Sequence, residues 1–302
     1  MADATILETR CPASLPGTSV FDIAPSGDAG VLPYRVFVYT PSGEASETGW
    51  PVLYMVDGNA VFATAIDAVR AQASYPKGTN VTHGMVVAIG YPTDAAYDPL
   101  RRSWDLSPPP GRAYPPFHMG GPDVRTGGGE DFLRFIEDAL KPMLEARFPI
   151  DRGRQTLFGH SFGGLFALYA LFRRPAAFRT WVAASPAIYW EDTVIARSRD
   201  ALSGDDWRDF KGRVLLSAGE YETAELAPFQ RRAPDAESRR THLSKVRTVE
   251  TAREWADEIN VLAGRVDAAT FERFAGENHM SVLPVAVNRA VQATFVAQTE
   301  EP

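Results

Sequence analysis

The chain has 302 residues, of which 45% are hydrophobic and 23% charged, a composition ordinary for a globular protein with a buried core. Its formal net charge of −7 at pH 7 argues against a nucleic-acid partner, which needs a concentrated basic face. The nearest approach to such a face is a pair of Arg-Arg steps, and the carboxylates of Asp235 and Glu237 lie between them.

The N-terminal segment has no feature of an export signal. Residues 1–10 include Asp3 and Glu8 and lack the apolar stretch of a secretory signal. No apolar run of the chain approaches the length of a membrane span. We therefore expect a cytoplasmic protein with no membrane partner. The single cysteine, Cys11, excludes an intramolecular disulfide and a cysteine-based metal site.

The first expected elements are two strands, over residues 18–25 and 33–40. The second is rich in β-branched and aromatic residues and is bracketed by prolines. The segment between them, 25–30, is rich in proline, glycine and aspartate, which suits a hairpin-like connection. We expect these strands to form an antiparallel edge of a sheet.

The chain then enters an alternation of strands and helices. A continuous apolar run at 51–56 is typical of a strand buried on both faces, and a helix over 60–73 and a buried strand over 85–89 follow. Residues 91–129 differ, because they are rich in proline and glycine and show little periodicity. Their aromatic side chains favour an ordered insertion, which would form a pocket wall. The alternative is a flexible linker.

The remaining elements follow from the same patterns of apolar spacing. In chain order they are helix 130–147, strand 155–159, helix 165–172, strand 179–185, a short helix 192–202, strand 213–217, an exposed polar segment 226–240, an amphipathic helix 243–263, strand 270–275 and a C-terminal helix 281–297.

Two edge strands followed by repeated strand-helix units predict an α/β-hydrolase fold, with a mostly parallel twisted sheet and helices on both faces. The insertion at 91–129 should lie near the active site. No internal repeat or domain linker is evident, so we expect residues 1–302 to form a single domain. Catalytic groups should lie at the carboxyl ends of the strands.

The motif G-x-S-x-G at residues 159–163 lies between an expected strand and an expected helix, the context of a nucleophile elbow. The turn holds Ser161 in a strained conformation that leaves room only for glycine at positions 159 and 163. A third glycine, Gly164, keeps the first helical turn slim. The sequence therefore predicts that Ser161 is a nucleophile.

A serine hydroxyl needs a base, and in this fold the chain order is serine, acid, histidine. Two histidines follow Ser161, namely His242 and His279. We predict His279 as the base, because it lies in a loop between the last strand and the last helix. His242 is expected to be a solvated residue near a helix start. The side chain of His160 is expected to point to the opposite side of the turn from Ser161.

The acid should follow the strand at 213–217. The usual spacing favours Glu222, with Glu220 as the backup, and a serine–histidine dyad without an essential acid remains an alternative. The oxyanion hole should combine the backbone N–H groups of Asn59 and Phe162. No nucleotide fingerprint, P-loop or metal-ligand spacing is present, so we expect neither a cofactor nor a metal.

With these residues in view, the chain resembles the esterase-D-like "putative esterase" family of α/β-hydrolases. Within that family it is similar to a bacterial branch that contains siderophore esterases of the enterobactin, salmochelin and bacillibactin type. The segments that carry the resemblance are 52–62, 89–92, 101–106, 159–171, 184–186 and 276–279.

The resemblance implies that Ser161 and His279 hydrolyse a small-molecule carboxylic ester through an acyl-enzyme. Siderophore esterases open trilactone scaffolds that bear catecholates, so the substrate implied is a siderophore, including its ferric complex. Arg101 and Arg102, with Tyr91, would then contact the anionic substrate. The alternative, which we prefer for the arginines, is structural pairing with Asp105 and other loop carboxylates.

Three other functions stay open. A general short-chain carboxylesterase or an acyltransferase would use the same machinery on a different substrate. A non-catalytic binding protein would retain only the fold, although the full set of catalytic residues argues against it. The sequence specifies no oligomeric state.

Overall fold

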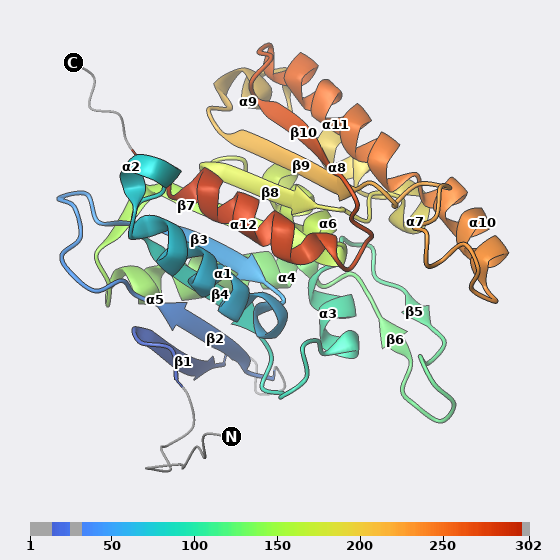
Figure 1. The fold of residues 1–302 in the computed structure, drawn as a ribbon, viewed down its shortest axis with the longest axis horizontal. Coiled ribbons are helices and arrows are strands. Elements are labelled where there is room, and N and C mark those ends of the chain that lie inside the picture. Colours follow the sequence, from blue (N-terminus) through green and yellow to red (C-terminus); the bar gives the residue numbers. More distant parts are fainter. Residues whose placement is uncertain (1–13, 25–31, 298–302) are drawn as a thin grey trace, which may run out of the picture.

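The centre of the computed structural model, which describes residues 14–24 and 32–297, is an eight-stranded sheet with the order β1-β2-β4-β3-β7-β8-β9-β10 (Figure 1). β1 pairs antiparallel with β2, and β2 with β4, while all other neighbours are parallel. The α/β-hydrolase prediction is confirmed. The strands of this sheet are β1 Thr18–Ile23, β2 Tyr34–Tyr39, β3 Trp50–Val56, β4 Met85–Gly90, β7 Ile150–His160, β8 Thr180–Ala184, β9 Arg213–Gly219 and β10 Ala269–Phe274.

Helices cover both faces of the sheet, and the alternation of side chains along each strand supplies two cores. Along β3, Tyr54 points into the core that contains α6, whereas Leu53 and Met55 point into the core that contains α1 and α12. This explains the continuous apolar run. The helices are α1 Gly58–Ala73, α2 Pro76–Thr79, α3 Pro99–Asp105, α4 Gly129–Arg134, the π-helix η1 Phe135–Leu140, α5 Lys141–Glu145, α6 Phe162–Arg173, α7 Trp190–Thr193, α8 Ala196–Asp200, α9 Gly204–Asp209, α10 Ala236–Val246, α11 Thr248–Ala263 and α12 Val282–Thr294.

The antiparallel edge was predicted correctly, because β1 and β2 pair along their full lengths. The expected turn at 25–30, the residues 1–10 and Cys11 lie outside the described residues. Within the described ranges, no helix has both the length and the apolar character needed to cross a membrane.

Three helix predictions were wrong in detail. The expected short helix at 192–202 is divided into α7 and α8. The expected helix at 130–147 is divided into α4, the π-helix η1 and α5. The expected helix at 243–263 is two helices, because Arg247 adopts left-handed backbone angles between α10 and α11. α10 also extends into the segment expected to be only polar and exposed. In α10 only Ala236 and Val246 are buried, so its sequence lacks the repeated apolar positions that predict a helix.

The insertion at 91–129 is ordered, as predicted. It contains α3 and a two-stranded hairpin, β5 Ala113–Tyr114 with β6 Val124–Arg125, which projects from the body of the molecule (Figure 1). Ser107, which is fully buried, joins its parts. The Ser107 hydroxyl donates to the carbonyl of Ser103 at 2.6 Å and accepts from the N–H of Gly127 at 2.7 Å.

Replacing Ser107 with alanine should lower the free energy of unfolding by about 1–3 kcal/mol, because the N–H of Gly127 loses its acceptor. Urea denaturation of the two proteins measures the difference. The control is Ser74→Ala at an exposed hydroxyl, which should stay within about 0.5 kcal/mol of the parent. Equal stability of Ser107→Ala and the control would show that this hydroxyl does not hold the insertion.

Candidate active site

The nucleophile elbow lies where β7 ends and α6 begins. Ser161 has φ 59° and ψ −115°, a strained conformation that the surrounding turn enforces. A Cβ atom at Gly159 would collide with the carbonyl group of Gly163, and one at Gly163 would lie 2.7 Å from a methyl group of Val56. The structure therefore explains why the motif needs both glycines.

Two helix N-termini meet beside Ser161. Phe162 is the first residue of α6, and Asn59 lies in the first turn of α1, so neither N–H has an acceptor within its own helix. The strands that lead into these helices, β3 and β7, are hydrogen-bonded neighbours. The Asn59 side chain is held in place, because its amide donates to the carbonyls of Tyr91 and Thr93 at 3.0 and 2.9 Å. This arrangement favours negative charge beside the serine.

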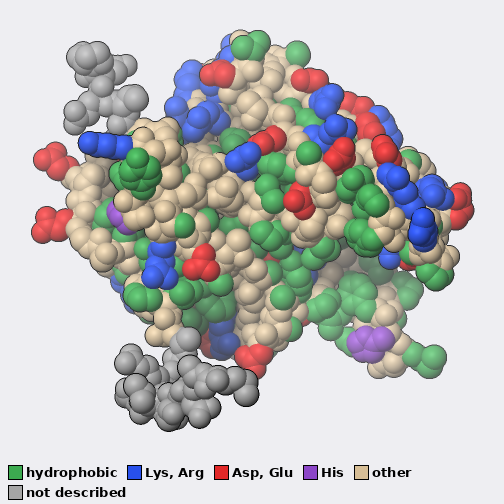
Figure 2. Space-filling model, viewed as in Figure 1, with side chains coloured by type: hydrophobic (Ala, Val, Ile, Leu, Met, Phe, Trp, Pro, Cys, Tyr) green, Lys and Arg blue, Asp and Glu red, His purple; other side chains and the backbone are tan. Residues whose placement is uncertain are grey.

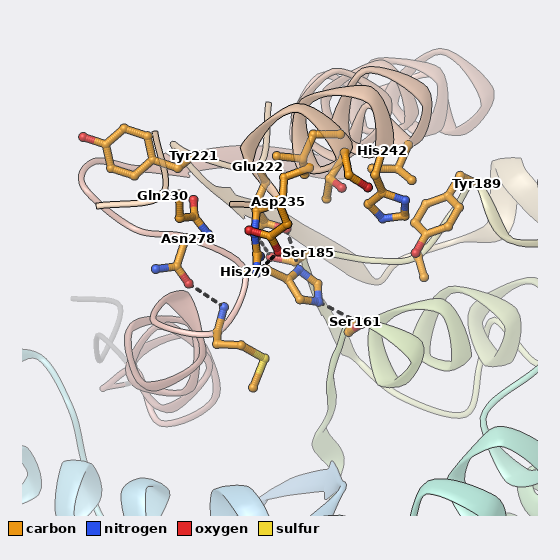
Figure 3. Close-up of a pocket in the computed structure, with 17 residues that line it drawn as sticks. Ser161, Ser185, Tyr189, Tyr221, Glu222, Gln230, Asp235, His242, Asn278 and His279 are labelled. Carbon is orange, nitrogen blue, oxygen red and sulfur yellow. Dashed lines mark hydrogen bonds and ion pairs between the residues drawn. The ribbon is translucent and has the colours of Figure 1, made fainter. Parts of the chain in front are cut away.

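The structure brings Ser161, His279 and Glu222 into one line of hydrogen bonds (Figure 3). Nε2 of His279 lies 3.0 Å from Oγ of Ser161, and Nδ1 lies 2.6 Å from Oε2 of Glu222. Since the carboxylate can only accept, Nδ1 carries the proton and Nε2 is free to accept the serine proton.

Glu222 is almost fully buried, at 1% exposed. Burial alone raises the pKa of a carboxyl group, but hydrogen bonds from His279, Ser185 and the N–H of Gly219 outweigh it and hold the pKa of Glu222 below its usual range. Ser185 follows β8 and was not predicted as a site residue. The signal for it was its position directly after a strand end.

The backup acid, Glu220, lies elsewhere. Its carboxylate accepts a hydrogen bond from the N–H of Gly276 at 2.6 Å and so braces the loop that leads to His279. The imidazole of His279 donates its hydrogen bond to Glu222 and not to Glu220, so the geometry favours the residue that the sequence favoured.

The expectation for His160 was wrong. Its side chain does not point away from the site: it lines a cavity beside Ser161, and Nε2 donates to the backbone carbonyl of His279 at 2.8 Å. The two imidazole rings lie 4.7 Å apart. Burial, together with the neighbouring His279, lowers the pKa of His160 to about 3, so this ring stays neutral beside the ring of His279.

Two cavities meet at Ser161, His279 and Met280. The first, which we call the α10 pocket, measures about 550 Å³ and has His242 on its wall. His242 is exposed, as expected, but it lies within α10 and not near the start of a helix. Its other lining residues include Tyr189, Tyr221, Gln230, Asp235, Ser238 and Arg239.

The second cavity, which we call the aromatic pocket, measures about 600 Å³. Its walls come from the insertion, α6 and the start of α7, and they include Tyr97, Arg102, Tyr114, Phe117, Phe162 and Trp190. The insertion therefore does form a pocket wall, as predicted. The hairpin tip presents hydrophobic side chains and a histidine to solvent (Figure 2).

The predicted substrate-binding residues are separated by the structure. Arg102 lines the aromatic pocket and pairs with the buried Asp57, through two contacts of 2.9 Å, and not with Asp105. Arg101 lines neither pocket, because its guanidinium donates to backbone carbonyls and stacks on Tyr91. Tyr91 is buried in the core at 3% exposed. Of the three, only Arg102 is placed to contact a ligand.

Metal binding was not expected from the sequence. Across residues 14–24 and 32–297, no group of three or more His, Cys, Asp or Glu side chains is arranged to hold a metal ion. The absence of a required cofactor remains a prediction.

The chain is similar to several known proteins. The model of the family described as "Putative esterase" matches residues 32–218. The ferri-bacillibactin esterase BesA of Bacillus subtilis is 35% identical, over 92% of this chain and 90% of its own length. The siderophore triacetylfusarinine C esterase of Aspergillus fumigatus is 36% identical, over 94% and 95%.

Among solved structures, the siderophore hydrolase EstA of Aspergillus nidulans superimposes with a TM-score of 0.78 and 30% identity. The match covers 95% of this chain and 98% of that one. The similarity therefore extends over nearly the whole length of both chains.

Replacing Glu222 with glutamine should lower kcat by about 10³- to 10⁴-fold. The amide N–H₂ would then face Nδ1 of His279 and hold the imidazole in the wrong tautomer. Glu220→Gln should cost less than about tenfold, because the amide oxygen can still accept from Gly276. Steady-state hydrolysis of an activated ester compares the two. A worse defect in Glu220→Gln would refute the assignment of the acid, and equal activity of Glu222→Gln and parent would favour a dyad.

The pKa of His160 predicts acid sensitivity. Between about pH 6.5 and 3 the unfolded chain binds a proton at this residue and the folded chain does not, so stability falls as pH falls through this window. His160→Gln should reduce the slope of the unfolding free energy against pH by up to about 1.4 kcal/mol per pH unit. Urea titrations from pH 4.5 to 6.5 measure the slope.

The matched control is His118→Gln, at an exposed position of the hairpin, which should leave that slope as in the parent. A parent-like slope in His160→Gln would show that His160 is already protonated in the folded protein.

Proposed function

The chain belongs to the "putative esterase" family, and we propose that it is a siderophore esterase that opens ester bonds of a trilactone or related siderophore through an acyl-enzyme on Ser161. The observation that carries the proposal is the hydrogen-bonded line from Glu222 through His279 to Ser161, with a cavity on each side of the serine. Glu222 is the proposed acid and His279 the proposed base.

The first half of the reaction forms the acyl-enzyme. Nε2 of His279 takes the proton of Ser161 while Oγ attacks the ester carbonyl. The oxyanion that develops accepts hydrogen bonds from the N–H groups of Asn59 and Phe162, at the N-termini of two helices. Glu222 stabilises the imidazolium across its 2.6 Å hydrogen bond.

Departure of the alcohol completes the first half. The imidazolium gives its proton to the alcohol oxygen as the ester C–O bond breaks, so the alcohol leaves neutral and the acyl-enzyme remains. The second half releases the acid. The neutral imidazole then takes a proton from water, whose oxygen attacks the acyl carbon, and collapse of this second intermediate returns the proton to Ser161. One water is consumed for each ester bond.

The choice of a siderophore over a simple ester rests on the site and on the relatives. Both cavities lie within the range that small-molecule sites occupy, so the site has room for bulky groups on either side of the bond. Aromatic walls and the guanidinium of Arg102 suit an anionic aryl group such as a catecholate. The relatives named above act on bacillibactin and triacetylfusarinine C.

Ferric siderophores are proposed substrates as well as the iron-free forms, because one of these relatives is named for the ferric complex. Iron would enter as part of the substrate. The cytoplasmic location and the single-domain organisation remain predictions.

The proposal is tested by hydrolysis of enterobactin-type and bacillibactin-type trilactones, each ferric and iron-free, beside a chain-length series of p-nitrophenyl esters. The trilactones should open rapidly and the simple esters slowly. Ser161→Ala should reduce trilactone opening by at least about 10⁴-fold, because it removes the nucleophile. Product analysis by chromatography and mass spectrometry reads out each cut.

Good turnover of short esters with intact trilactones would contradict the siderophore assignment and indicate a general carboxylesterase. Transfer of the acyl group to an added alcohol, in preference to water, would indicate an acyltransferase.

A further inference from the structure

The α10 pocket lies on the side of the site where Glu222 and His279 meet. Its outer wall consists of α10 and the segment before it, and its inner wall contains Ser185 and Glu222. None of the residues of the insertion contributes to it. The aromatic pocket, in contrast, contains Phe162 and the insertion but neither Ser185 nor Glu222. The two pockets are therefore chemically different approaches to the same serine.

Two rings stand together in the α10 pocket. The ring centroids of Tyr189 and His242 lie 6.3 Å apart with their planes at 89°. Figure 3 shows the two side chains adjacent to each other, on the side of the pocket toward which the Ser161 end of His279 points. Tyr189 follows β8 and is half-buried, whereas His242 comes from the exposed α10. An edge-to-face pair of this kind offers an aryl group one ring face and one ring edge.

Polar side chains of α10 and of the residue before it also line this pocket. Arg239 is half-exposed and forms an ion pair of 2.7 Å with Asp235, and Ser238 lies beside it. Lys and Arg side chains gather over this edge of the molecule (Figure 2). Such a wall suits a group that combines an aromatic ring with amide and hydroxyl functions.

The direction of the reaction assigns the two halves of the ester. The carbonyl oxygen must reach the N–H of Phe162, which lines the aromatic pocket. The leaving oxygen must reach Nε2 of His279, and this end of the imidazole points toward the side of the α10 pocket where Tyr189 and His242 lie (Figure 3). The acyl half therefore extends into the aromatic pocket and the alcohol half toward α10.

We infer that the α10 pocket is the binding site for the alcohol half of the ester, and that Tyr189 and His242 bind an aryl amide group carried by that alcohol. The inference rests on the proposed ester hydrolysis at Ser161. In a trilactone both sides of each ester bond carry such a group, so a substrate of this class fills both pockets at once. An ester of a small alcohol leaves the α10 pocket empty.

Two model esters distinguish the acyl half of the ester from the alcohol half. O-Acetyl-N-benzoylserinamide carries its aryl group on the alcohol, whereas the ethyl ester of N-benzoylserine carries it on the acyl group. His242→Ala should raise KM for the first about five- to tenfold, the loss expected for one aromatic contact, with kcat changed much less. For the ethyl ester, the same variant should change KM less than twofold.

Three further variants sharpen the test. His242→Phe keeps a ring beside Tyr189 and should restore most of the lost affinity. Phe117→Ala, in the aromatic pocket, should raise KM for the ethyl ester more than KM for the acetyl ester. The matched control is Thr241→Ala, the neighbouring position on α10, which lines neither pocket and should match the parent on both esters.

A second readout is inhibition of p-nitrophenyl acetate hydrolysis by the product alcohol, N-benzoylserinamide. Its inhibition constant should rise in His242→Ala by the same factor as KM. The inference is overturned if His242→Ala raises KM for the ethyl ester instead. It is also overturned if neither KM value nor the inhibition constant changes. A parent enzyme that leaves trilactones intact would refute the siderophore proposal alone, because the model esters still report on the pocket.

Discussion

The site depends on one buried carboxylate. Glu222 accepts hydrogen bonds from Ser185 and from the N–H of Gly219 while its second oxygen faces Nδ1 of His279. These bonds outweigh the cost of burying the charge, and they orient the imidazole from behind. The loops after β8, β9 and β10 must therefore come together at one end of the sheet before Ser161 has a base.

The second constraint is steric. Ser161 has positive φ, and the glycines around it let α6 approach the end of β3. That approach brings together the first turns of α1 and α6, which contain the proposed oxyanion donors, the N–H groups of Asn59 and Phe162. The buried pair of Asp57 and Arg102 fixes the loop between β3 and α1 and also supplies a cation to the aromatic pocket.

Much of this could be predicted from sequence, because the decisive signals are local. The elbow lies within five residues, and the expected chain order picked out His279 and Glu222. The hydrogen bond of Ser185 to Glu222, the inward orientation of His160 and the pairing of Arg102 with Asp57 could not be predicted. Each of these depends on contacts between segments far apart in the chain. Most of α10 was not predicted, because this polar helix buries few side chains and lines a cavity instead.

The most direct test of the central claim is labelling with a fluorophosphonate, followed by intact-mass measurement and peptide mapping. The account predicts one label per chain, on Ser161, absent in Ser161→Ala and formed at least about 100-fold more slowly in His279→Ala. A folded parent protein that stays unlabelled, or that is labelled at another residue, would contradict the account.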